Sequence, residues 1–341
     1  MGTNHRAPRR WMAATAVLTV LLPGTAAAQE LPDLTLEELM RVTIQRVFGA
    51  SERLQPVTEA PASVTIVTAE EIRRHGYRSL ADVLHRVRGF FVSNDRNYSY
   101  VGVRGFGLPG DYNSRVLLLV NGHKINDNIY DQAYAGAEFG LDVDIIERIE
   151  VIRGPASSLY GTSAFFAVVN VITKSGASMR GVSLQADAGT LGTGRVRGSF
   201  GRTFARGVDV GLSGSLEGSQ GVEGLYFPAF DAPETNHGVA ENLDGERVGT
   251  LYGRIGVRNL TVTATFGRRQ KDIPTGSYST MFNSQDPREE TTDTRTMVHA
   301  QYEGSIAQTR LAADVAYDRL HYSGVYPYAA GDEDTTTLAF D

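Results

Sequence analysis

The sequence contains no cysteine, which excludes disulfide scaffolds, zinc ribbons, thiol catalysis and iron–sulfur clusters. It has no excess of positive charge either. The 33 Lys and Arg stand against 39 Asp and Glu, and this net charge of −6 argues against binding nucleic acid through net charge. After the first 28 residues there is no long apolar run, so insertion into a membrane would have to use β-strands.

Motifs of enzymes and cofactor sites are also missing. The 7 histidines show no metal-ligand spacing, and neither G-x-S-x-G nor H-E-x-x-H occurs. Residues 105–110 match G-x-G-x-x-G, but an expected strand follows where a dinucleotide site needs a helix. Asp142 and Asp144 could contact calcium, although Asp144 is better explained as a helix cap. We therefore predict no catalytic residue, no metal site, no cofactor and no nucleic-acid partner.

The first 28 residues have the pattern of a secretory signal peptide. Arg6, Arg9 and Arg10 precede an apolar run from Trp11 to Leu22, and small residues end at Ala28. Twelve apolar residues are too few to cross a membrane, which needs ~20 in a helix. We therefore expect cleavage before residue 29, followed by an N-terminal extension over 29–56.

Residues 57–174 have the pattern of a mixed α/β domain. Thr68 and Glu71 form a capping box at the start of a helix, and a second helix is expected after Ser79. Strands are expected at 62–67, 100–104, 116–120, 150–153 and 167–173, and a short helix capped by Asp144 at 145–149. The run 116–120 is apolar on both faces, which predicts burial on both.

Residues 175–341 alternate between apolar and polar side chains, which predicts β-strands. Seven strands are expected near 182–188, 196–200, 208–216, 251–255, 260–266, 298–302 and 311–317, and an eighth near 335. Long links at 218–245 and 268–293 alternate with short ones at 203–206, 257–258 and 305–307, and only the short link 190–193 breaks this pattern. A soluble β-sandwich also alternates. The loop pattern and the signal peptide favour an antiparallel transmembrane β-barrel.

Several spaced motifs over about residues 40–175 resemble the plug domain of TonB-dependent outer-membrane receptors. They are APASV at 60–64, VTAEEI at 67–72, VRGF at 103–106, LLLVNG at 117–122, IERIEVIRGP at 146–155, SLYG at 158–161 and VNVITK at 169–174. The resemblance implies a plug inside a barrel in the outer membrane of a Gram-negative bacterium, in contact with its lipid. It also implies import of a scarce large nutrient: a ferric siderophore, haem, cobalamin or an oligosaccharide. The alternative is a surface signalling receptor or adhesin that does not transport.

The same resemblance implies a partner, TonB, which is energised by ExbB–ExbD through the proton-motive force. TonB would pull a TonB box, a segment that pairs by strand addition. The β-prone run upstream of the plug is our choice for this box, and the alternative is that it is a linker. Its residues are Val42, Thr43, Ile44, Gln45, Arg46 and Val47.

By the same resemblance, Arg104 and Arg153 match plug arginines that pair with acids on the barrel wall, and Glu150 belongs to the same motif. A buried guanidinium must be paired, because loss of its partner costs ~3–5 kcal/mol. Ligand contact is expected on the loops 106–114 and 127–140, where aromatic side chains lie beside polar ones. The expected ligand-binding residues are Phe106, Tyr112, Asn113, Asn128, Tyr130, Asp131 and Tyr134.

Size arithmetic predicts that the barrel is incomplete in this chain. A plug region of 29–174 should have a radius of gyration of about 15 Å. Enclosing it takes roughly 22 strands. Only about 7–8 strands are present, so residues 175–341 are expected to be the N-terminal part of a truncated barrel, and 341 to fall inside a strand.

Overall fold

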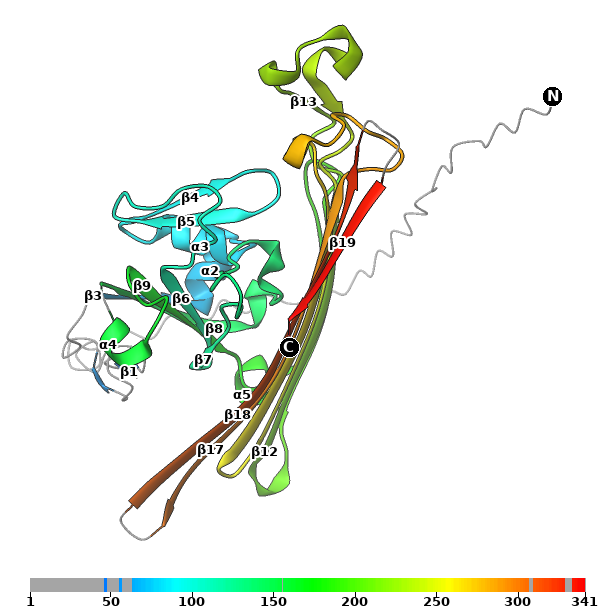
Figure 1. Cartoon of the computed structure of the whole chain (residues 1–341). Helices are drawn as coiled ribbons and strands as arrows, with labels where there is room; N and C mark the ends of the chain where they lie inside the picture. The colour runs from blue at the N-terminus through cyan, green and yellow to red at the C-terminus, as the bar shows by residue number, and fades with distance from the viewer. Residues whose placement is uncertain are drawn as a thin grey trace, which may run out of the picture. The chain divides into compact units, whose positions relative to one another are not determined.

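The computed structural model describes residues 46–47, 55–56, 63–154, 156–306, 309–328 and 333–340. The signal-peptide prediction and the box residues Val42 to Gln45 lie outside this part. From β1 onward the chain forms an α/β domain, up to β9, and then an eight-stranded antiparallel sheet (Figure 1). No described helix is long and apolar enough to span a membrane.

The α/β domain is built around a five-stranded sheet in the order β3-β8-β9-β6-β7, in which only β6 and β9 are parallel. Its elements are β1 Arg46–Val47, β2 Gln55–Pro56, β3 Ser63–Thr68, α2 Ala69–His75, α3 Leu80–Arg86, β4 Phe90–Asn94, β5 Ser99–Val103, β6 Val116–Val120, β7 His123–Lys124, η2 Ala137–Phe139, η3 Val143–Ile145, β8 Ile146–Arg153, α4 Ser157–Tyr160 and β9 Ala167–Thr173.

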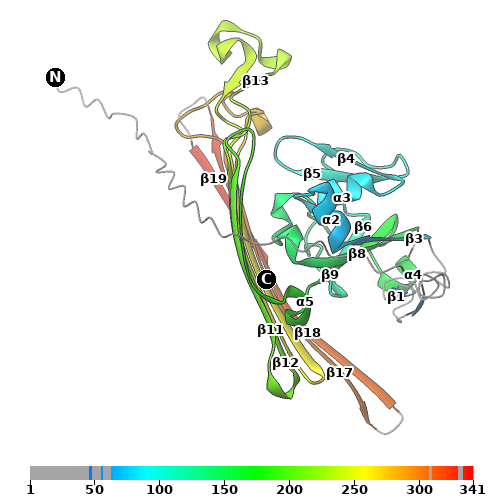
Figure 2. The ribbon, with the colours of Figure 1, turned by 180° about the vertical axis from the view of Figure 1, so that it is seen from behind.

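The two expected helices are present, and each begins with a capping box. The Thr68 hydroxyl accepts from the Glu71 N–H in α2, and Ser79 and Asp82 repeat the motif in α3. Gly76 ends α2 at φ +66°, in the left-handed region that favours glycine. The apolar faces of both helices pack on one face of the five-stranded sheet (Figure 2). All five residues of β6 are buried, as its apolar pattern predicts.

The helix expected at 145–149 is wrong. Asp142, not Asp144, caps a single 3-10 turn, η3, by accepting from the Asp144 N–H at 2.8 Å. The chain then enters strand β8 at Ile146, because β3 and β9 pair with it on either side. Ile146 and Ile149, which fit a helical period, therefore lie in a central strand instead, and both pack in the core that α2 and α3 share.

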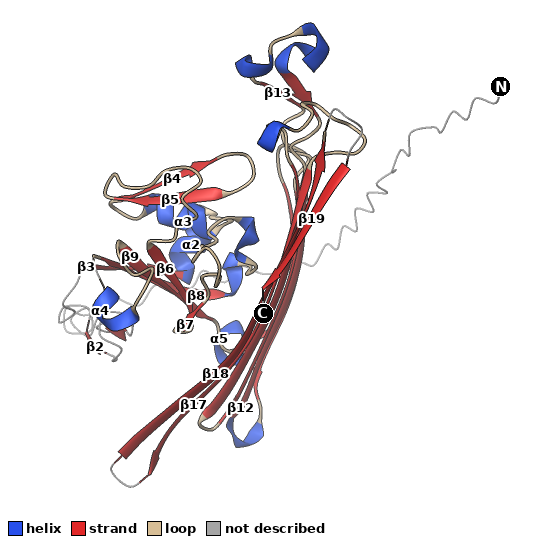
Figure 3. Ribbon diagram, viewed as in Figure 1, coloured by secondary structure: helices blue, strands red, loops and turns tan. Residues whose placement is uncertain are grey.

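The large sheet follows α5, Gly176–Met179, and confirms all eight expected strands (Figure 3). Its strands are β10 Gly181–Ala188, β11 Gly194–Thr203, β12 Val208–Ser219, β15 Glu246–Val257, β16 Leu260–Asp272, β17 Glu290–Ile306, β18 Thr309–Pro327 and β19 Glu333–Phe340. Between β12 and β15 lies a small hairpin, β13 Gly224–Tyr226 and β14 Val239–Glu241. Its two strands are joined through η5 Pro228–Phe230 and η6 Pro233–Gly238, whereas η4 Ala205–Gly207 precedes β12 and η7 Ser277–Ser279 precedes β17. In the described order β10 and β19 are the edges, so this sheet is open.

One face of this sheet carries exposed apolar side chains. Val182 and Leu184 are 75% and 81% exposed, and Leu216 and Val315 resemble them. The opposite face carries Arg195, Arg197 and Tyr252, which contact the α/β domain. Apolar side chains facing outward are typical of a sheet whose outer face meets lipid.

Candidate functional site

Two arginines of the large sheet join it to the α/β domain. Arg195 and Arg197 occupy alternate positions on β11 and form ion pairs with Asp142 and Asp144 at η3. Arg195 also lies 3.7 Å from Glu217 on β12. The Asp142 side chain is buried, and it caps η3 as well, so one carboxylate fixes both the turn and its docking. We call these four residues the seam cluster: Arg195, Arg197, Asp142 and Asp144.

A second buried cluster lies further along the seam, by which we mean the contact between the large sheet and the α/β domain. Arg269 on β16 pairs with Glu246 at 2.6 Å and with Asp293 at 3.2 Å. From the α/β domain, Asn97 accepts from Arg269 at 3.1 Å, and the Tyr98 hydroxyl donates to Asp293 at 3.0 Å. The Arg269 guanidinium also lies 5.4 Å from the Tyr98 ring centre. Each buried charge therefore has a counter-charge, as its burial requires.

Backbone contact between the two parts depends on glycine. A Cβ on Gly267 of β16 would lie 2.4 Å from the Gly140 Cα of the α/β domain. Gly140 has φ +79°, so it too favours the absence of a side chain. These two glycines therefore allow the α/β domain to touch the sheet directly.

A cavity of about 340 Å³ lies in the seam beside these clusters, and its lining includes Glu138, Asp142, Arg195 and Arg269. Glu138 Oε1 accepts from the Gly136 N–H at 2.9 Å, and Oε2 has no hydrogen-bond partner among the described residues. Burial raises the pKa of Glu138 to about 7. No three His, Asp or Glu in the described chain are arranged to hold a metal ion.

The arginines predicted to lock the plug behave differently. Arg153 donates to the Arg88 carbonyl, Ser63 Oγ and Thr65 Oγ1 at 2.8–2.9 Å, all within the α/β domain. Arg104 is exposed and makes no ion pair among the described residues. The buried Glu150 pairs with Arg148 at 2.9 Å. The seam cluster has the opposite polarity, with arginines on the sheet and acids on the domain.

Sequence reasoning missed the seam cluster, although a signal for it exists. Arg195 and Arg197 alternate with Val196 and Gly198, so a strand there must turn both arginines to the face away from the apolar residues. Their acidic partners were recognised only as a cap or a calcium ligand. The alternation along this strand, combined with the Asp-x-Asp pair at 142–144, would have predicted the contact between the arginines and the aspartates.

Three of the predicted ligand-binding residues are exposed aromatics, and a fourth, Asn128, is exposed as well. The Tyr112 and Tyr130 rings stack at 4.9 Å with an interplanar angle of 13°, and so join the two predicted loops. Phe106 stacks on Phe166 at 5.7 Å. Asp131 is half-buried and pairs with Lys124 at 2.7 Å.

Two other residues predicted to contact the ligand, Asn113 and Tyr134, are buried. Asn113 is 3% exposed: its Oδ1 accepts from the Val101 N–H, and its Nδ2 donates to the Ser99 and Ala133 carbonyls. Its amide therefore holds the loops together. Tyr134 is 7% exposed, and its ring lies 5.7 Å from the Arg295 guanidinium, inside the seam.

Residues of the large sheet complete the aromatic surface. Tyr278, in the connection between β16 and β17, packs edge-on against Tyr326 of β18 at 5.8 Å. Partial burial and the nearby charges of Tyr112 and Asp95 raise the pKa of the Tyr278 phenol. We call Tyr112, Tyr130, Tyr278 and Tyr326 the tyrosine surface. Its two members from the sheet were not predicted.

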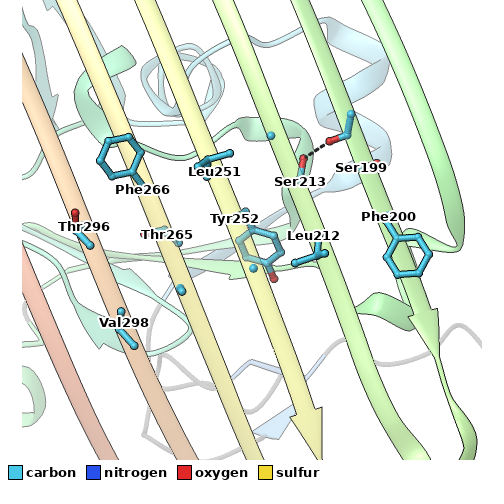
Figure 4. Close-up of a pocket in the computed structure, with 14 residues that line it drawn as sticks. Ser199, Phe200, Leu212, Ser213, Leu251, Tyr252, Thr265, Phe266, Thr296 and Val298 are labelled. Carbon is cyan, nitrogen blue, oxygen red and sulfur yellow. Dashed lines mark hydrogen bonds between the residues drawn. The ribbon is translucent and has the colours of Figure 1, made fainter.

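A separate hollow of about 690 Å³ lies on the apolar outer face of the sheet. Figure 4 shows Phe200, Leu212, Leu251 and Phe266 around it. Its floor includes glycines of β11, β12 and β15, where no side chain fills the space. This hollow faces away from the seam, so it is separate from the cavity beside Arg195 and Arg269.

The comparisons with known proteins agree with this architecture. The family "TonB-dependent Receptor Plug Domain" matches residues 56–168. The chain is 39% identical over 181 residues to a vitamin B12 transporter of Vibrio vulnificus, a match that covers 52% of this chain and 28% of that protein. It is 29% identical over 254 residues to a ferric enterobactin receptor of Pseudomonas aeruginosa, covering 68% of this chain and 32% of that protein.

Solved structures share the fold. The ferric yersiniabactin uptake receptor of Yersinia pestis has a TM-score of 0.59 at 16% identity, covering 84% of this chain and 44% of that one. The ferric enterobactin receptor of P. aeruginosa has a TM-score of 0.60 at 17% identity, covering 83% and 45%. The chain thus spans about a third or less of these curated relatives and less than half of these structures.

Proposed function

Because the chain belongs to the TonB-dependent receptors of the Gram-negative outer membrane, we propose that it imports a scarce large nutrient, driven by the proton-motive force through TonB. The observation that carries this proposal is the plug domain at 56–168, ion-paired to an antiparallel sheet with an apolar outer face. The relatives named above are transporters or receptors, which agrees with the expectation that this protein is not an enzyme.

The proposed contact with TonB is the box at 42–47, and ExbB–ExbD would energise that partner. In the described part of the box, Arg46 and Val47 pair with Pro56 and Gln55. A short two-residue ladder is weak, since an isolated hairpin is marginal in water. Strand addition by a partner could therefore replace it.

The proposed ligand set remains a ferric siderophore, haem, cobalamin or an oligosaccharide. One relative is a vitamin B12 transporter and another a ferric enterobactin receptor, so metal-containing ligands are the first to test. We propose contact through Phe106, Tyr112, Asn128 and Tyr130, which are exposed, with Asp131 at the margin. Arg104, Arg153 and Glu150 stay proposed for plug–wall pairing.

The test is uptake of radiolabelled cyanocobalamin and of ⁵⁵Fe-labelled siderophores into cells that express the protein, with and without TonB. We expect accumulation of one ligand that disappears in the cells without TonB while surface binding persists. Binding without TonB-dependent accumulation of any ligand would instead indicate a surface receptor or adhesin and would refute the import proposal.

A further inference from the structure

We propose that the ligand of this receptor carries no net negative charge. It would be a large uncharged or cationic molecule with flat faces, held by tyrosines, and not a polyanion such as a ferric tris-catecholate. This inference rests on the proposed function, because it concerns the ligand taken up at the same surface.

The long connections and the predicted plug loops lie at one end of the large sheet. Because neighbouring strands are antiparallel, the connections 220–245 and 273–289 share an end, opposite the short turns 204–207 and 258–259. The Asn97 side chain accepts from Thr291 at 3.1 Å near that end. Arg96 of the plug pairs with Asp244 of the connection 220–245 at 3.5 Å.

The ionisable residues of these loops are almost all acidic. The plug loops 106–114 and 127–140 contain four Asp and Glu and no Lys or Arg. The connection 220–245 contains five acids and no Lys or Arg, and 273–289 contains two acids and one base, Arg288. At the overall frequency of 33 Lys and Arg in 341 residues, these segments would carry about six. Such a surface repels anions and lowers their rate of arrival.

Five of the basic residues close to this surface are already engaged. Arg288 pairs with Asp272 at 3.3 Å, Lys271 with Asp244 at 2.8 Å, and Arg96 with Asp244 at 3.5 Å. Lys124 pairs with Asp131, and Arg269 is buried between two carboxylates. A polyanion would have to break these pairs, since carboxylates and catecholates are recognised by free guanidinium or ammonium groups.

Two exposed arginines beside this surface make no ion pair among the described residues: Arg104, which is proposed above for plug–wall pairing, and Arg115. The discriminating exception is Arg115. It is exposed beside the loop 106–114, and its guanidinium lies 5.8 Å from the Phe166 ring centre. An anionic ligand at Phe106 would depend on this side chain, whereas an uncharged ligand held by the tyrosine surface would not. Four acids of the connections make no ion pair among the described residues: Glu223, Glu234, Glu241 and Asp286. They add to the negative potential of this surface and do not stabilise the fold through ion pairs.

The experiment compares three probes on the protein in outer-membrane vesicles: cyanocobalamin, an uncharged ferric tris-hydroxamate, and a trianionic ferric tris-catecholate with the same metal. We expect at least one uncharged probe to bind on the order of 100-fold more tightly than the catecholate at low salt, within the range that charge complementarity spans. Arg115→Gln should leave that binding unchanged, and Tyr130→Ala should weaken it roughly tenfold, as loss of ring stacking does.

A variant with fewer acidic residues tests whether negative charge causes the preference for uncharged ligands. Replacing Glu223, Glu234, Glu241 and Asp286 by their amides should speed catecholate association by about tenfold at 20 mM salt, with no difference at 500 mM. Catecholate binding as tight as that of the uncharged probes, loss of binding in Arg115→Gln, or no binding by either uncharged probe would each overturn the inference. Uptake in cells with and without TonB distinguishes a failure of the charge inference from a failure of the import proposal. TonB-dependent uptake of the catecholate refutes the charge inference alone.

Discussion

At the scale of single residues, Glu138 couples the seam to pH. Its buried carboxyl has a pKa of about 7 in the folded protein, against a usual 4.5. Between these values the folded chain holds a proton that the unfolded chain has released. Stability should therefore fall as the pH rises through this window, by roughly 3 kcal/mol in total.

We expect Glu138→Gln to remove that pH dependence and to unfold at a higher temperature than the wild type at pH 8. Thermal unfolding followed by circular dichroism at pH 5 and pH 8 measures the effect. Glu234→Gln, at an exposed carboxylate, is the matched control and should follow the wild type. Equal pH dependence in Glu138→Gln and the wild type would contradict the prediction.

Individual residues also show the limit of sequence reasoning at the site. The exposed Tyr112 and the buried Asn113 are adjacent, both polar and both in a predicted ligand loop. Which of the two faces outward depends on the carbonyls of Ser99 and Ala133, and these approach Asn113 only in the folded domain. A loop has no periodic pattern of apolar residues, so the sequence alone does not show which of these two side chains is buried.

At the scale of elements, the seam cluster connects η3 to β11. Arg195→Gln would leave Asp142 buried with fewer counter-charges, at a cost of about 3 kcal/mol. We expect faster proteolysis of the plug in folded protein, and partial rescue when Asp142→Asn is added. Arg202→Gln, exposed on the same strand, is the control. An additive double mutant would show that the two side chains do not interact.

The proposed TonB box is also an element-scale prediction. Ile44→Pro removes a backbone N–H from a segment that would pair by strand addition. We expect ligand binding to persist and TonB-dependent uptake to be lost. Leu36→Pro, upstream of the box, is the control and should transport normally. Uptake by Ile44→Pro at the wild-type rate would move the box elsewhere.

Elements differ in how far sequence determines them. β6 and β9 have the predicted bounds, because an apolar run buried on both faces fits only a central strand. β8 was partly misread as helix, because the spacing of Ile146 and Ile149 fits a helical period. Both pack in one core because the pairing with β9 is irregular between Ile146 and Arg148, which the sequence pattern does not reveal. β17 is longer than predicted, because Glu290 to Arg295 is polar on both faces and gives no alternation.

At the scale of the whole molecule, the exposed apolar face of the large sheet requires a lipid environment. Leu212 lies on this face beside the outer hollow. Leu212→Arg should cost about 2–4 kcal/mol if it sits near the bilayer midplane. We expect less folded protein in outer-membrane fractions, measured by heat-modifiable migration in gels. Leu212→Met conserves volume and should assemble normally; normal assembly of Leu212→Arg would contradict a lipid-facing assignment.

The length of β18 has a consequence for the amides along it. Its 19 residues, at ~3.3 Å each and tilted ~40°, rise about 50 Å, roughly twice the ~25 Å apolar band of an outer-membrane barrel. The ladder with β17 therefore continues into water beyond the hydrocarbon. Deuterium should replace protons first at the protruding amides and last in the middle of the strand, so an exchange profile along β18 would locate the two edges of the membrane.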